Sequence, residues 1–153
     1  MANPLTLFVV LKTDTFSQGA DVLAAGNFPP KGATAASFYD TVHYARVALV
    51  PNQDGSAGNY GVLVITEFDG TMDTYLSAFW NQQSPENGAT IKDVFVGLMS
   101  IALHPPKGYT GKDSVDYKMF YDFIYENNLN KDPEKNFSAY DWTVPQILTN
   151  MPS

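Results

Sequence analysis

Two residues whose side chains can carry chemistry lie close together in the first half of this sequence. His43 and Arg46 fall in the segment TVHYARVALVP, and Arg46 is the single arginine of a chain with two histidines. Histidine changes its protonation state near neutral pH, so His43 and the other histidine, His104, are candidate catalytic residues. A guanidinium can hold a planar anion through two parallel hydrogen bonds, which a lysine cannot do. These residue types predict a site that binds an acidic or carbonyl oxygen and moves protons beside it.

The alternation of side chains along a strand determines which of these residues can meet. In a regular strand, Tyr44 and Arg46 share one face, and His43 points to the other. The segment YGVLVITEF follows after a glycine-rich loop and predicts a hairpin partner that brings Glu67 near Arg46. A carboxylate beside a guanidinium offsets the cost of burying either charge. We therefore expect Arg46 to be buried and bonded to Glu67, either as an ion pair that fixes the strand register or as a ligand anchor oriented by the carboxylate.

Composition and missing motifs exclude several other classes of site. The net charge of −7 argues against a nucleic-acid surface, and the absence of cysteine removes disulfides and thiolate metal sites. Two histidines far apart in sequence also argue against a protein-only metal site, so we predict no metal and no cofactor. The motifs of nucleotide-binding proteins, zinc proteases and serine hydrolases are missing. Without a basic leader or a membrane-length apolar run, the sequence predicts a cytoplasmic protein with no membrane partner.

Apolar periodicity and turn residues predict one domain over residues 1–153. Strands are expected at 5–12, 40–51 and 60–68, with a short last strand at 137–140. Helices are expected up to about residue 25, at 69–83, at 90–103, at 115–129 and at 143–151. Asp69 and Gly70 are expected to form a turn and a helix cap. The proline- and glycine-rich loop 104–114, which His104 begins, is expected to contain no regular structure.

The order of these elements predicts an α+β fold. The β-α-β-β-α opening matches the split β-α-β, or ferredoxin-like, motif, with helices on one face of an antiparallel sheet and extra C-terminal helices here. The strands are apolar on both faces, so the second face should be covered as well. Two sheets packed face to face would cover it, which predicts a symmetric homodimer.

Several short segments together resemble a known group of proteins. The element HYAR on the second strand, ITEFDG at the end of the third and MDTYL at the start of the next helix resemble uncharacterised bacterial proteins of the dimeric α+β barrel superfamily. His104 in ALHPPKGY falls where those proteins carry a histidine after a later helix. The resemblance covers residues 5–109 and implies a ferredoxin-like dimeric α/β barrel. That superfamily includes cofactor-free monooxygenases, isomerase-like enzymes and haem-binding peroxidases, so the resemblance implies a fold more firmly than a reaction.

Two functional hypotheses follow from the candidate residues. The first is a small-molecule-binding protein, an enzyme of cofactor-free oxidoreductase or isomerase-like type, in which His43 or His104 moves protons. Its expected substrate-binding residues are Arg46, Glu67, Tyr44 and Asp69. The alternative is a non-catalytic dimer that binds a metabolite or a protein partner, or a haem-binding peroxidase-like relative. The peroxidase motif Gly-x-x-Asp-Gly corresponds to residues 66–70, where its first glycine is replaced by threonine.

Overall fold

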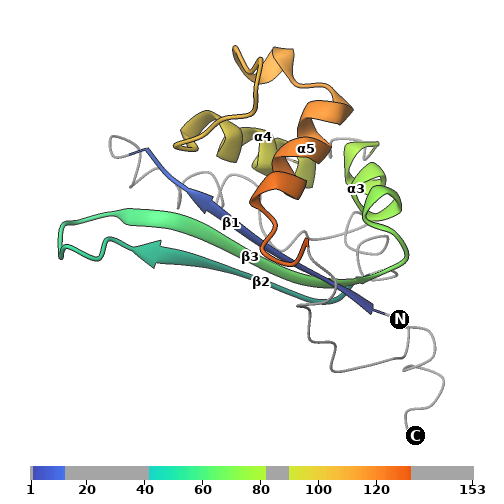
Figure 1. Cartoon of the computed structure of the whole chain (residues 1–153), viewed down its shortest axis with the longest axis horizontal. Coiled ribbons are helices and arrows are strands. Elements are labelled where there is room, and N and C mark those ends of the chain that lie inside the picture. The colour runs from blue at the N-terminus through green and yellow to red at the C-terminus, as the bar shows by residue number, and fades with distance from the viewer. Residues whose placement is uncertain (1, 13–41, 82–89, 132–153) are drawn as a thin grey trace, which may run out of the picture.

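The computed structural model describes residues 2–12, 42–81 and 90–131 of the chain. These residues form an α+β fold with a three-stranded antiparallel sheet and three α-helices (Figure 1). The elements in chain order are β1 (Ala2–Val10), β2 (Val42–Pro51), β3 (Asn59–Asp69), α3 (Met72–Trp80), α4 (Ile91–Ile101), the short 3-10 helix η2 (Lys112–Ser114) and α5 (Tyr117–Asn127). The first expected helix, the strand at 137–140 and the helix at 143–151 lie outside the described residues.

The sheet has the strand order β1-β3-β2. Both outer strands pair antiparallel with β3, so β1 and β2 run parallel to each other with β3 between them. The hairpin from β2 to β3 turns through residues 52–58, where Gly55 and Gly58 adopt positive φ angles of 78° and 107°. Glycine reaches this left-handed region without steric cost, which is why the glycine-rich loop can reverse the chain. The three strands predicted in these parts of the chain are therefore confirmed.

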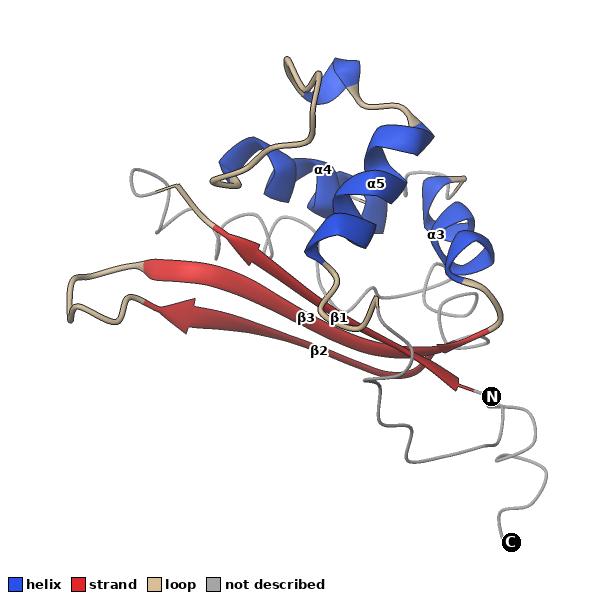
Figure 2. Cartoon of the chain, viewed as in Figure 1, coloured by secondary structure: helices blue, strands red, loops and turns tan. Residues whose placement is uncertain are grey.

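All three described α-helices cover the same face of the sheet (Figure 2). The core fills the space between them, because alternate strand residues and one side of each helix are apolar. Its most deeply buried side chains include Leu5, Leu7, Val62, Leu76, Leu98, Met99, Phe120 and Ile124. The opposite face of the sheet has no helix over it among the described residues, and we call it the open face.

Side chains that accept backbone hydrogen bonds begin each helix. Thr71 caps α3 by accepting from the Thr74 amide, and Thr90 caps α4 in a capping box with Asp93. The expected cap at Asp69 is therefore wrong: Asp69 ends β3, Gly70 makes the turn with a φ of 84°, and Thr71 follows as the cap. The loop that follows α4 also holds one regular turn, η2, where no regular structure was expected.

The outer edge of β1 is partly covered by two later segments of the chain. Leu11 forms an isolated bridge with Ala102, and the Leu103 amide donates to the carbonyl oxygen of Val10 at 2.8 Å. Nearer the N-terminus, the Leu129 amide donates to the carbonyl oxygen of Thr6 at 2.8 Å. These bonds satisfy backbone groups that an edge strand would otherwise expose. They also fix the segments after α4 and α5 against the sheet.

Candidate functional site

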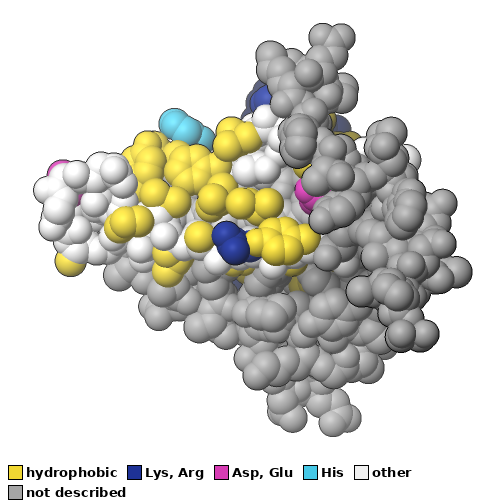
Figure 3. Space-filling model, turned by 90° about the horizontal axis from the view of Figure 1, so that it is seen from below, with side chains coloured by type: hydrophobic (Ala, Val, Ile, Leu, Met, Phe, Trp, Pro, Cys, Tyr) yellow, Lys and Arg dark blue, Asp and Glu magenta, His cyan; other side chains and the backbone are white. Residues whose placement is uncertain are grey.

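The open face is arranged in rows of side chains that run across the three strands. Paired residues place Phe8, Leu63 and Ala48 in one row, and Val10, Gly61 and Val50 in the next, toward the hairpin. Toward the other end, Thr6, Ile65 and Arg46 form a row, followed by Pro4, Glu67 and Tyr44. The face is therefore apolar near the hairpin and polar at the end that carries the arginine. Figure 3 shows hydrophobic side chains gathered on this side with a basic group among them.

Arg46 lies on the open face and is exposed to solvent. Its guanidinium carbon lies 5.8 Å from the centroid of the Tyr44 ring, which is itself 45% exposed. Such a contact between a cation and an aromatic face is attractive, but weakly so at an exposed site. The expected burial of Arg46 is wrong for the single chain. The physical reason is that β2 is the outer strand of the described sheet, and no described helix covers this face.

Glu67 shares the open face with Arg46 but does not pair with it directly. The register places Glu67 opposite Tyr44 and Ile65 opposite Arg46, so the two charges are diagonal neighbours. Diagonal neighbours across an antiparallel pair lie roughly 7–8 Å apart at Cα, which only long side chains span. Among the described residues, no ion pair joins Arg46 and Glu67. The sequence therefore predicted the shared face correctly and the bonded pair wrongly.

His43 occupies an irregular position in β2. The pairing with β3 shifts between Val42 and Tyr44, which marks a β-bulge at this histidine. Val42 is buried in the core while Tyr44 is exposed on the open face, so the bulge reverses the alternation at this point. The expectation that His43 lies opposite Arg46 assumed a regular strand. The side chain of His43 is outside the described part of the structure, so its catalytic role stays a prediction.

His104 lines a pocket of about 710 Å³, which lies between the chain after α4 and one side of α5. The remaining lining residues are Pro105, Pro106, Lys107, Asp116, Lys118, Met119, Asp122, Phe123, Glu126 and Asn127. Neither Arg46 nor Tyr44 is among them. The described structure therefore places Arg46 and His104 at separate sites, and the expected joint site of these two residues does not form within it.

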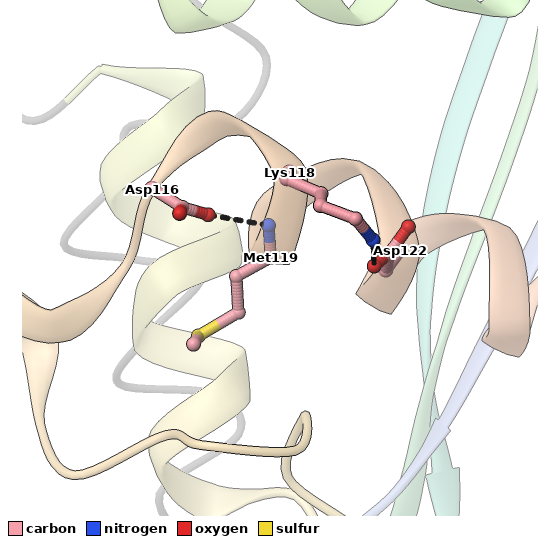
Figure 4. Close-up of polar contacts among 4 residues, drawn as sticks. All are labelled: Asp116, Lys118, Met119 and Asp122. Atoms are coloured by element: carbon pink, nitrogen blue, oxygen red, sulfur yellow. Dashed lines mark hydrogen bonds and ion pairs between the residues drawn. The ribbon is translucent and has the colours of Figure 1, made fainter.

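Several polar groups of this pocket lie on α5 and at its N-cap, and Figure 4 shows three of them, Asp116, Lys118 and Asp122. Asp116 accepts a hydrogen bond from the Met119 amide at 2.7 Å and so caps the helix. Lys118 forms an ion pair with Asp122 one turn later, and this contact raises the pKa of the Lys118 ammonium group. The sequence predicts a packed aromatic helix here, with the lining of an apolar pocket as the alternative, and its charged residues were not among the predicted site residues. The i, i+4 spacing of Lys118 and Asp122, beside the proline-rich loop, was the signal that could have pointed to it.

The described residues contain no group of three or more histidine, aspartate or glutamate side chains that could hold a metal ion. Among the same residues, no helix has the length and apolar character needed to cross a membrane.

Comparison with protein-family models, with curated proteins and with solved structures finds no match to this chain.

Proposed function

We propose that this protein is a homodimer of the ferredoxin-like, dimeric α+β barrel type that binds a small acidic or carbonyl-bearing molecule between its two sheets. The observation that carries the proposal is the open face, where an exposed arginine without a carboxylate partner among the described residues stands beside apolar side chains. The strand arrangement supports it, because β1 and β2 are parallel with β3 between them, as in a split β-α-β unit.

A second copy of the chain is the partner that best fits the open face. Phe8, Leu63 and Ile65 are only partly exposed, yet together with neighbouring apolar residues they form one continuous surface. Contiguous apolar surface on a folded chain indicates an interface. In a dimer with a two-fold axis, the same surface patch of each subunit packs against its copy on the other, so both open faces are covered by one interface. Two twisted sheets packed face to face would then enclose the side chains of both open faces.

Arg46 becomes the ligand anchor in this arrangement. Packing a second sheet over the open face removes water from the guanidinium, and a desolvated charge requires a counter-charge. Glu67 lies diagonally across the strands, and Tyr44 provides an aromatic surface at 5.8 Å. A ligand carboxylate or carbonyl oxygen would complete the hydrogen bonds of Arg46 in two-point geometry. The separation of Arg46 from His104 supports ligand binding over proton transfer by that pair.

The dimer is tested by sedimentation velocity on the purified chain. We expect a species of twice the 16.8 kDa chain mass at micromolar concentration. Leu63→Lys places a charge at the centre of the open face and should shift the protein to monomer. Tyr125→Lys is the matched control, because Tyr125 is 41% exposed and lies on α5, which packs on the opposite face of the sheet. A wild-type monomer at 16.8 kDa would contradict the proposal.

Ligand binding is tested with acetate, benzoate and 2-oxoglutarate by thermal shift and by isothermal titration. We expect at least one of these carboxylates to bind, and Arg46→Met to abolish that binding. Arg46→Lys should restore little of it, because an ammonium group cannot form the two-point contact. Lys112→Met is the control for simple loss of positive charge, since Lys112 is exposed on η2. Equal binding by the wild type and Arg46→Met would refute the role of the arginine.

A further inference from the structure

We propose that the pocket beside α5 is a second, independent binding site, and that its ligand is a zwitterionic amino compound such as a short apolar peptide. The pocket volume of about 710 Å³ is in the range of small-molecule sites, which is roughly 300–1,000 Å³. The pocket is formed within one chain, so it does not require the homodimer.

The floor of the pocket is apolar. Met119 and Phe123 lie one turn apart on α5, and Phe123 is buried. Pro105 and Pro106 contribute further apolar surface from the facing loop. A Cβ atom at Gly108 would lie 3.7 Å from the Met119 methyl carbon, so the loop beyond these prolines already approaches the helix closely. An apolar side chain of a ligand would find contacts on both sides of this floor.

The two walls carry opposite charge. The loop wall presents Lys107 and His104, and neither has an ion-pair partner among the described residues. The helix wall presents three carboxylates, Asp116, Asp122 and Glu126, and one ammonium group, Lys118. Because Lys118 pairs with Asp122, the remaining negative charge lies at the two ends of this wall.

Glu126 is the carboxylate best placed to hold a ligand ammonium group. Its contact with Lys131 is long, at 3.9 Å, and both side chains are exposed, so this pair contributes little stability. A simple anion would be attracted by Lys107 and repelled by the helix wall. A simple cation would be attracted by the helix wall and repelled by Lys107. A ligand that carries a carboxylate at one end and an ammonium group at the other satisfies both walls, and an apolar body fills the floor.

The probe is the dipeptide L-leucyl-L-leucine, titrated into isotopically labelled protein and followed by amide NMR. We expect shifts in residues 104–108 and in α5. Its N-acetyl form and its C-terminal amide each lack one charge, and each should bind about tenfold more weakly than the free dipeptide. Equal binding of the three forms, or no shifts in these segments at roughly 20 mM dipeptide, would overturn the proposal.

Charge-removing variants assign each end of the dipeptide to a wall. Lys107→Met should weaken binding of the free dipeptide about tenfold and leave binding of its C-terminal amide unchanged. Glu126→Gln should leave binding of the N-acetyl form unchanged. Lys112→Met and Asp113→Asn on η2 are the matched controls and should change nothing. Leu63→Lys should keep dipeptide binding even where it abolishes the dimer, which separates this site from the open face. Loss of binding in either control variant, or in Leu63→Lys, would contradict the assignment.

Discussion

A buried hydrogen bond between α3 and the central strand gives the sharpest test of the packing under the helices. The Tyr75 hydroxyl and Oγ1 of Thr66 lie 3.1 Å apart, in side chains that are 4% and 2% exposed. The Tyr75 ring stacks on Phe68 with its centroid 4.2 Å away at 11°. Tyr75→Phe keeps this ring and removes only the hydroxyl. The change should therefore report the polar contact alone.

The expected loss follows from the burial of both groups. A buried neutral hydrogen bond contributes about 0.5–1.5 kcal/mol net, and a hydroxyl left without a partner adds a desolvation cost of about 1–3 kcal/mol. We expect Tyr75→Phe to lower the free energy of unfolding by about 1–2 kcal/mol, and Thr66→Val to lower it similarly. The double variant removes both polar groups at once. It should cost about 1 kcal/mol less than the sum of the two single changes.

Urea unfolding followed by circular dichroism measures these four proteins, with thermal melts as a second measurement. In a chain of this size, 1 kcal/mol corresponds to roughly 2–4 °C in Tm. Tyr121→Phe is the matched control, because Tyr121 lies on α5 and is partly exposed. Additivity of the two single variants within about 0.3–0.5 kcal/mol would show that the hydroxyl groups do not interact, and would refute the reasoning.

Three further outcomes follow from local geometry. Gly61→Ala should cost about 1–3 kcal/mol in urea unfolding, because its Cβ would lie 2.9 Å from the backbone carbonyl oxygen of Val9 and 2.7 Å from a ring carbon of Phe8; a change below the measurement error would contradict these contacts. Thr90→Ala removes the capping box of α4 and should cost about 1 kcal/mol by the same assay. Burial and the hydrogen bond to Asp73 raise the pKa of Tyr117 to about 12 from 10.0. The unfolded chain therefore loses this proton first, so stability should fall as pH rises from 10 toward 12, and Tyr117→Phe should flatten that fall in a pH series of thermal melts.

The sequence by itself determined the elements and their faces, because these depend on neighbours close along the chain. Period-two alternation placed Tyr44 and Arg46 on one face of β2, and the structure keeps them there. The glycine-rich loop predicted the hairpin, whose register brought Glu67 to the same face. Apolar spacing predicted α3, α4 and α5 within a few residues of their ends. Each of these conclusions needs only local geometry.

The tertiary structure decided what covers each face and which groups meet. Whether Arg46 is buried depends on elements distant in sequence, and the described helices all pack on the other face. The bulge at His43 arises from pairing with β3 and interrupts an alternation that the sequence suggested was regular. The pocket at His104 exists because bonds to the edge of β1 anchor the segment after α4, while α5 packs beside it. Long-range packing and pairing carry this information, and no short window of the sequence contains it.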